Sequence, residues 1–421
     1  MNVREAAVYI LERIDEGAYI NITLNHFLSE NKLSRVDADL LTRLVYSIKS
    51  HQIPLEYYLK QFIEGKRVRP FEKRVLLVAS CQMLYFDKIP DYAIIDESVE
   101  MVKKKRGPKG AGFINALLRQ MTKNKTLDFT HLSDLEQLSL TYSHPLWLVK
   151  MLNKQYGHDV LIEILKENQS VPMLSARVNT IKTTTDELLK QYPELKKGVL
   201  AKDSIYFASG NIANTSLYKD GLVTVQDEAS QWVVEQLDVK PGMKVLDMCS
   251  APGSKTTHIA ARMNNEGEIH AYDIFDHKIK LIEANAKRLG CEIIKAKAYD
   301  STKLLEIEEA ESFDAILLDG PCSGLGVLAR KPEIRYHDAS MMDELIQIQY
   351  ELLKTASSLL KKGGHMVYST CTLNKKENRK NIDRFLGEHP EFELIEDRTI
   401  LPFEYHSDGF YMARLVKKNE N

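Results

Sequence analysis

The sequence contains few cysteines, and their spacing excludes two common uses of this residue. Five occur among 421 residues, an odd number spread widely along the chain, with no Cys-x-x-Cys pair and no histidine cluster. Disulfide frameworks and zinc sites depend on such groupings. We therefore expect no disulfide framework and no metal site, and we expect Cys81 and Cys291 to be core residues.

Long apolar stretches are also missing. No run approaches the roughly 18 residues of a membrane-spanning helix, and the first residues, MNVRE, lack the apolar core of a signal peptide. Internal repeats and low-complexity tracts are absent as well, and the composition, 44% hydrophobic and 28% charged, is that of a globular protein. We expect a soluble cytoplasmic protein with no membrane partner, folded into two or three domains.

Charge nearly cancels over the whole chain but not within its first third. The net charge is −2, yet residues 1–125 hold 21 of the 57 Lys and Arg and only 15 of the 59 Asp and Glu. Apolar residues in this stretch recur at helical spacing, as in LLTRLVYSI at 40–48. The pattern predicts a basic, all-helical domain. Its run KKKRGPK at 103–109 suits phosphate groups, although a solvated helix end is the alternative explanation.

Residues 126–220 predict a smaller α+β module. A polar connection at 126–136 precedes a helical stretch that starts near residue 144. The segment 175–180 is strand-like and leads into a helix from Thr185. No chemistry is indicated by these residues on their own.

The remaining residues, 221–421, predict an α/β domain with a nucleotide-type cofactor site. A strand-like segment at 244–247 is followed by a tight loop, in which Pro252 and Gly253 turn the chain and allow a ligand to approach the backbone. The free N–H groups of the helix that starts next favour a carboxylate or phosphate. The loop matches neither Gly-x-Gly-x-x-Gly nor a Walker motif.

Three aspartates follow successive strands of this predicted sheet. Asp247, Asp273 and Asp300 end neighbouring strand-like segments, where an acidic side chain can take both hydroxyls of a ribose. Together they fit a cofactor with amino acid, ribose and adenine parts. Taken singly, each is also explained as a helix N-cap or a solvated loop acid.

Two cysteines point to catalysis. Cys322, in LDGPCSG, and Cys371, in YSTCT, follow the aliphatic segments 315–318 and 365–368, which are typical of buried parallel strands. The carboxyl ends of such strands form the active-site edge of an open α/β sheet. One thiol there is most simply a small core residue, but two favour covalent chemistry with a separate release step.

The motifs Ser250-Ala251-Pro252-Gly253, Asp319-Gly320-Pro321-Cys322-Ser323-Gly324 and Ser369-Thr370-Cys371-Thr372 resemble the S-adenosylmethionine-dependent RNA cytosine-C5 methyltransferases. The resemblance covers about residues 224–417 and implies a Rossmann-like methyltransferase domain. It also implies that S-adenosyl-L-methionine is bound by Cys249, Ser250, Ala251, Pro252, Gly253, Ser254, Lys255, Asp273, Asp300 and Asp319. Ser254 stands where the family usually has a second glycine, and we expect it to cap the following helix.

The chemistry of this family accounts for two thiols. Carbon 5 of cytosine becomes nucleophilic only after a thiolate has added to carbon 6. The resemblance implies that Cys371 attacks, that Cys322 assists release and that Asp319 hydrogen-bonds the cytosine. The residues alone leave the order of the thiols open, because DNA cytosine-C5 methyltransferases use the cysteine of the Pro-Cys motif. Lys255 either lowers the pKa of a neighbouring thiol or is a solvated lysine.

Segments 91–99 and 112–119 resemble the helical bundle of the antitermination factor NusB, an RNA-binding fold. The two resemblances together imply a monomeric enzyme of three parts, 1–125, 126–220 and 221–421. Its implied substrate is one cytosine in a loop or partly unfolded region of 16S ribosomal RNA.

Further RNA contacts are expected outside the thiol motifs. The resemblance places Arg177 and Asn179 in the groove that binds RNA, and Arg330, Lys331 and Arg335 follow Cys322 as a group suited to phosphates or to an ordinary charged helix entry. A tRNA cytosine-C5 methyltransferase and a non-catalytic RNA-binding transcription factor stay open as alternative functions.

Overall fold

The structure, a computed structural model, describes residues 2–419. The chain forms two compact units, of which one comprises Met1–Gln169 with Lys331–His337 and the other Ser170–Arg330 with Asp338–Asn421. The three domains with boundaries near residues 125 and 220 stay a prediction. The sequence did not predict that the short segment Lys331–His337, which follows Cys322, folds with the first unit.

The first unit is helical, as predicted. Its elements are α1 (Val3–Asp15), α2 (Ile20–Glu30), α3 (Arg35–Ser50), α4 (Gln52–Ile63), α5 (Pro70–Tyr85), α6 (Asp91–Met121), α7 (Asp134–Thr141), α8 (Leu146–Tyr156), α9 (His158–Glu167) and the 3-10 helix η3 (Pro332–Tyr336). Local signals fix the helix starts, since Asn2 and Glu5 form a capping box on α1 and Pro70 begins α5.

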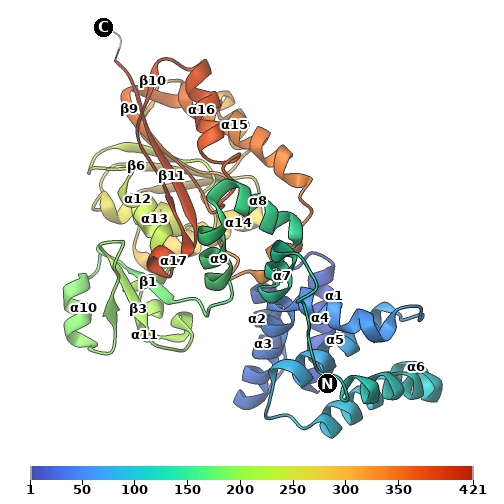
Figure 1. Cartoon of the computed structure of the whole chain (residues 1–421). Coiled ribbons are helices and arrows are strands. Elements are labelled where there is room, and N and C mark those ends of the chain that lie inside the picture. The colour runs from blue at the N-terminus through green and yellow to red at the C-terminus, as the bar shows by residue number, and fades with distance from the viewer. Residues whose placement is uncertain (1, 420–421) are drawn as a thin grey trace. The chain divides into compact units, whose positions relative to one another are not determined.

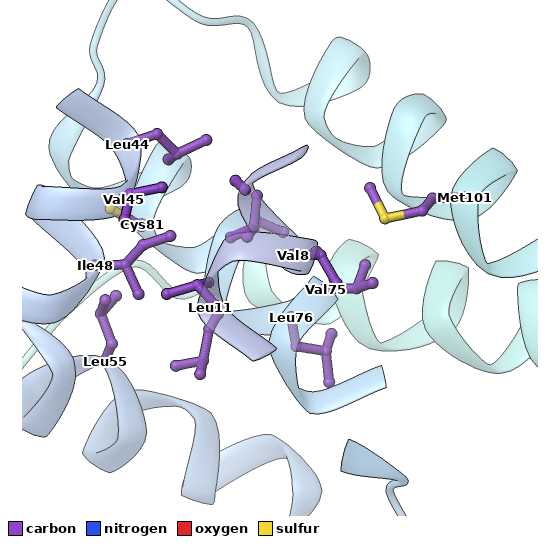
Figure 2. Close-up of a cluster of buried hydrophobic side chains, with 14 of the residues drawn as sticks. Val8, Leu11, Leu44, Val45, Ile48, Leu55, Val75, Leu76, Cys81 and Met101 are labelled. Carbon is purple, nitrogen blue, oxygen red and sulfur yellow. The ribbon is translucent and has the colours of Figure 1, made fainter. Parts of the chain in front are cut away.

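The core of the helical unit gathers the apolar faces of α1, α3, α4 and α5 (Figure 2). Leu11, Ile48 and Leu55 converge there and are nearly inaccessible to solvent. Cys81 lies in the same cluster, where burial raises the pKa of its thiol to about 12. Its role is packing, as predicted, because a thiol that keeps its proton is unreactive.

The basic run at 103–109 is less available than the sequence indicates. It lies within α6, where Gly107 leaves the helical conformation with φ of 72°. Lys103 pairs with Glu100 at 3.1 Å, and Lys104 pairs with Glu5 at 2.9 Å. Lys105 lies over the ring of Phe71. Exposed ion pairs of this kind are weak, so phosphate binding by this run stays a prediction.

The expectation that Arg335 is one of a group of cations suited to RNA phosphates is wrong. This guanidinium is fully buried in the helical unit, where it donates to the carbonyl oxygens of Ser143 at 3.1 Å and Asn168 at 2.6 Å. Arg330 belongs to the other unit and pairs with Asp227 and Asp408. Arg335 therefore holds neutral backbone groups inside the helical unit, and Arg330 is already paired with two carboxylates. Phosphate binding by Arg330 and Lys331 stays a prediction.

Replacing Arg335 by methionine is expected to lower the free energy of unfolding of the helical unit by about 3 kcal/mol, because buried carbonyl oxygens lose their donors. Chemical denaturation followed by circular dichroism measures this. Arg67→Met, at an exposed position, is the matched control and should change the free energy by less than about 0.5 kcal/mol. Equal stability of the two variants would show that the buried guanidinium does not hold this segment.

The second unit begins with a small antiparallel sheet of order β2-β3-β1-β4. Its elements are β1 (Leu174–Val178), α10 (Thr185–Gln191), β2 (Lys196–Lys197), β3 (Ser204–Phe207), η1 (Ile212–Asn214), α11 (Ser216–Lys219) and β4 (Val223–Val225). The predicted strand near 175 and the predicted helix from Thr185 are both confirmed.

Arg177 and Asn179 are not RNA contacts, contrary to expectation. Each is 1% exposed, with Arg177 on β1 and Asn179 directly after it. Arg177 donates to the carbonyl oxygen of Ser254 at 2.6 Å and to the hydroxyl of Thr257 at 3.1 Å. Asn179 donates to the carbonyl oxygen of Leu289 at 2.8 Å. The two side chains tie this part of the chain to the helices Ser254–Arg262 and Asp276–Leu289, which cover the larger sheet.

The large sheet has seven strands in the order β10-β11-β9-β8-β5-β6-β7. Its elements and covering helices are α12 (Glu228–Glu235), β5 (Lys244–Asp247), α13 (Ser254–Arg262), β6 (Glu268–Asp273), α14 (Asp276–Leu289), β7 (Ile294–Ala298), η2 (Ser301–Glu306), β8 (Phe313–Asp319), α15 (Met341–Leu359), β9 (Leu360–Thr370), α16 (Arg379–Glu388), β10 (Phe392–Ile400), α17 (Pro402–Tyr405) and β11 (Phe410–Lys417). Strands β5 to β9 are parallel, and β10 and β11 pair in antiparallel fashion.

Alternate residues of the central strands enter two separate cores. Ala315 and Leu317 of β8 pack with α12, α13 and α14 on one face, whereas Ile316 and Leu318 pack with α15 and α16 on the other. Figure 1 shows α15 and α16 beside the long strands β9 and β11. Both faces are therefore covered, as a parallel sheet requires. The chain runs outward from β5 in both directions, so a crevice opens at the carboxyl ends of β5, β6 and β8.

Candidate active site

A cavity of about 330 Å³ lies at this crevice. Its wall combines residues that follow β5, β6, β7 and β8 with two apolar residues of α15. Five of the predicted cofactor residues line it: Cys249, Ala251, Asp273, Asp300 and Asp319. Ser250, Pro252, Gly253, Ser254 and Lys255 are not among the lining residues and shape the loop or the helix start behind it.

The loop after β5 is tightly held. Ser250 donates both its N–H and its hydroxyl to the carbonyl oxygen of Tyr272, each at 2.8 Å. Gly253 has φ of 98°, and a Cβ atom there would lie 3.0 Å from the Cα atom of Ile282. Only glycine satisfies both conditions. The expectation for Ser254 is wrong, because Gly253 is the N-cap of α13, no side chain caps it, and Ser254 is already helical.

The three strand-end aspartates differ in position. Asp273 lines the cavity and lies 3.5 Å from the ammonium of Lys278. Asp300 also lines it and caps η2, accepting from the N–H of Thr302 at 3.0 Å. Asp247 is buried behind the loop, where burial raises its pKa to about 7 and the Thr256 hydroxyl donates to it at 2.7 Å. Two of the three can therefore face a ligand.

The apolar part of the cavity was not predicted. Phe275 is half exposed and lies two residues after Asp273. Ile348 and Leu352 come from α15, which lies between the motifs of Cys322 and Cys371 and outside both. The position of Phe275 next to a strand-end acid is a signal that the sequence does offer. Nothing in the sequence places α15 over this edge of the sheet, because that contact depends on the chain crossover between β8 and β9.

The two predicted thiols meet at neighbouring strand ends. Cys322 follows β8, Cys371 follows β9, and their sulfur atoms are 3.1 Å apart. The hydrogen bond with Cys371, together with burial and the nearby charge of Glu377, raises the pKa of Cys322 well above its ordinary value. Cys322 therefore keeps its proton and is placed to donate it to Cys371.

Asp319 links the thiol region to the loop after β5. Its carboxylate accepts from the ammonium of Lys255 and from the hydroxyl of Ser369, each at 2.7 Å. Burial alone would lower the pKa of Lys255. The charge and the hydrogen bond of Asp319 outweigh burial, so the pKa of Lys255 is raised above its ordinary value. The negative charge of Cys371 acts on Lys255 in the same upward direction. Lys255 is therefore a partnered cation near the thiols rather than a solvated lysine.

Three family models match the chain. The model described as 16S rRNA methyltransferase RsmB/F matches residues 234–416, the NusB family matches 1–123, and the ferredoxin-like domain of RsmF/B-like methyltransferases matches 144–208. A protein of Bacillus subtilis named probable ribosomal RNA small subunit methyltransferase B is 39% identical over 99% of each chain. The chain belongs to the ribosomal RNA small subunit methyltransferase B family. A relative of that name from Vibrio vulnificus is 32% identical over 99% of this chain and 100% of its own.

Solved structures agree with the membership. The crystal structure of PH0851 is 27% identical to the chain, with a TM-score of 0.87 over 99% of this chain and 98% of the other. A methyltransferase homologue from Pyrococcus horikoshii is 26% identical, with a TM-score of 0.61 over 68% of this chain and all of its own. The predicted resemblance and the predicted fold class, a NusB-like bundle, an α+β module and a methyltransferase sheet, are confirmed.

Membership of this family makes the protein an RNA methyltransferase. Among residues 2–419, no three His, Cys, Asp or Glu side chains are grouped as metal ligands. No helix in that range is long and apolar enough to span a bilayer.

Proposed function

We propose that the protein transfers a methyl group from S-adenosyl-L-methionine to carbon 5 of one cytosine in 16S ribosomal RNA, through a covalent adduct between Cys371 and carbon 6. The observation that carries the proposal is the distance of 3.1 Å between the sulfur atoms of Cys322 and Cys371. Cys322 directly follows Asp319 to Pro321, which line the cavity. The substrate class follows from the relatives that are named for the ribosomal RNA small subunit.

The cavity suits the proposed cofactor. Asp273 and Asp300 offer carboxylates to ribose hydroxyls, and Phe275 and Leu352 offer apolar walls to an adenine ring. Asp319 lines the cavity at the end of β8 and precedes Cys322 by three residues in the sequence. When bound, S-adenosylmethionine supplies the methyl group.

The thiols take different parts in the proposed reaction. The Cys371 thiolate adds to carbon 6, forming a carbon–sulfur bond and leaving carbon 5 nucleophilic. After methyl transfer a base removes the proton of carbon 5, and the electron pair of that C–H bond expels the Cys371 thiolate as the carbon–sulfur bond breaks. The raised pKa of Cys322 supports this order, because a thiol that keeps its proton is a poor nucleophile. Cys322 then assists release, as the resemblance implies.

In this proposal Asp319 hydrogen-bonds the target cytosine, and Lys255 holds Asp319 in place. A cytosine that is attacked at carbon 6 accumulates electron density at N3, which takes up a proton from solvent and then carries an N–H that can donate. A carboxylate next to a charged ammonium, 2.7 Å away, can accept a hydrogen bond from the base while the lysine holds it in place. The target base must leave its stack to reach the thiols, which favours a loop or a partly unfolded RNA.

Replacing Asp273 by alanine is expected to weaken S-adenosylmethionine binding to the full-length protein by about 5- to 150-fold, the equivalent of about 1 to 3 kcal/mol, because ribose hydroxyls lose their acceptor. Isothermal titration calorimetry measures the affinity. Asp276→Ala, three residues away and exposed, is the control and should bind as the unaltered protein does. Unchanged affinity of the Asp273 variant would remove this carboxylate from the proposed cofactor site.

The proposed function is tested with purified protein, S-adenosylmethionine carrying a labelled methyl group, and unmodified 16S ribosomal RNA. Digestion to nucleosides should yield labelled 5-methylcytidine and no other labelled nucleoside. Unmodified tRNA in a parallel reaction tests the alternative substrate. Label in tRNA alone would replace the ribosomal substrate by tRNA, and no label in either RNA would favour the non-catalytic alternative.

A further inference from the structure

A buried carboxylate lies between the two thiol loops. Glu377, in the loop that follows β9, is fully inaccessible to solvent. One of its oxygens accepts from the N–H of Ser323 at 2.9 Å and from the amide of Gln349 at 3.1 Å. The other accepts from the hydroxyl of Ser323 at 2.5 Å and from the amide of Asn374 at 3.1 Å. All four donors are neutral groups.

These donors come from the residues that flank the thiols. Ser323 is the neighbour of Cys322, and its hydroxyl also lies 2.7 Å from the hydroxyl of Thr372, the neighbour of Cys371. The amide of Gln349 on α15 donates to the carbonyl oxygen of Pro321 at 2.8 Å as well as to Glu377. The segments on both sides of Cys322 are therefore fastened to the loop of Cys371 through one carboxylate.

Stability does not account for this arrangement. Removing an ionised carboxylate from water is costly even when hydrogen bonds compensate it, and apolar residues of similar volume are often as stable. A buried charge does, however, fix geometry. If any of its donors moves away, the carboxylate is left with an unsatisfied hydrogen bond in a buried place, which is energetically costly. The negative charge of Glu377 is also one of the causes that raise the pKa of Cys322.

We infer that Glu377 is a positioning residue for the proposed covalent reaction: it holds the loops of Cys322 and Cys371 so that one thiol attacks while the other keeps its proton for release. The inference rests on the proposed function. It assigns the relative placement of the two sulfur atoms, which come from different strands, to a side chain that is fully buried and does not line the cofactor cavity.

Glu377→Gln tests the charge without changing the size of the side chain. In a Cys371→Ala background, alkylation of Cys322 by iodoacetamide is followed against pH by mass spectrometry of its peptide, without RNA or cofactor. The pH midpoint should be lower by about 1 in the Gln variant, because the like charge that favours the protonated thiol is gone. Glu377→Asp, which keeps the charge, should restore the midpoint. Glu393→Gln, an exposed position, is the matched control.

The second readout is turnover in the presence of Cys371. Glu377→Gln should lower methyl transfer at saturating RNA about 100-fold, since misplacing a reacting group by about 1 Å has that effect. If this variant does not fold, Ser323→Ala removes one donor and should lower turnover in the same direction by a smaller factor. A folded Glu377→Gln protein with an unchanged alkylation midpoint and unchanged turnover would overturn the inference. The alkylation experiment needs no RNA, so failure of the proposed function is seen separately.

Discussion

Cys371→Ala is expected to abolish methyl transfer and to form no covalent complex with RNA. The Cys371 sulfur is the proposed nucleophile, and without the carbon–sulfur bond carbon 5 of cytosine stays unreactive. The expected loss exceeds about 1,000-fold in the rate of methyl transfer. Transfer of labelled methyl groups to unmodified 16S ribosomal RNA measures it. Cys81→Ala, in the core of the helical unit, is a cysteine control that should leave the chemical step unchanged.

Cys322→Ala is expected to behave differently, because the two thiols act at different points of one pathway. The variant should still attack and methylate but release slowly, so a protein–RNA complex that survives a denaturing gel should accumulate. In the unaltered protein the Cys322 thiol lies 3.1 Å from the Cys371 sulfur, where it can assist the departure of that sulfur from the RNA. Accumulation in the Cys371 variant instead would reverse the two roles, and normal turnover in both variants would reduce the cysteines to packing residues.

Asp319→Asn is expected to lower the rate of methyl transfer by about 100-fold at saturating RNA and cofactor. An asparagine can still accept from Ser369, so the fold should persist, but the negative charge opposite Lys255 is lost. Burial lowers the pKa of Lys255 once its partner no longer opposes this effect, so the ammonium also loses its proton more easily.

The pH dependence of the Asp319→Asn variant separates these causes. As the pH rises, Lys255 of the variant should lose its proton earlier, so the remaining activity should begin to fall at a lower pH than in the unaltered protein. Asp276→Asn, at an exposed position, is the control and should change neither the rate nor the pH profile. An Asp319→Asn rate within about twofold of the unaltered rate would exclude this carboxylate from the proposed reaction.

The sequence predicted those parts of the site that lie on single strand–loop segments. Cys322 and Cys371 were expected at the ends of parallel strands, and both are there because an aliphatic run followed by a turn is a local signal. Asp273 and Asp300 were placed correctly at the edge of the cavity for the same reason. Local pattern also predicted the helices of residues 1–125.

The errors concern charged residues whose surroundings come from distant parts of the chain. Arg177 and Arg335 were expected to meet RNA, since an arginine is usually exposed, but each is buried against backbone carbonyl oxygens at least 75 residues away. Glu377 was missed for the same reason, because its partners Ser323 and Gln349 precede it by 54 and 28 residues. No periodicity in a single sequence indicates such a network.

Bisulfite sequencing of 16S ribosomal RNA from a strain that lacks this gene shows whether the protein methylates a ribosomal cytosine at carbon 5. One cytosine that is protected from conversion in the parent strain should be converted in the deletion strain. A plasmid copy of the gene should restore protection, and a copy with Cys371→Ala should not. Identical protection patterns in the parent and deletion strains would contradict the claim that this protein methylates carbon 5 of a ribosomal cytosine.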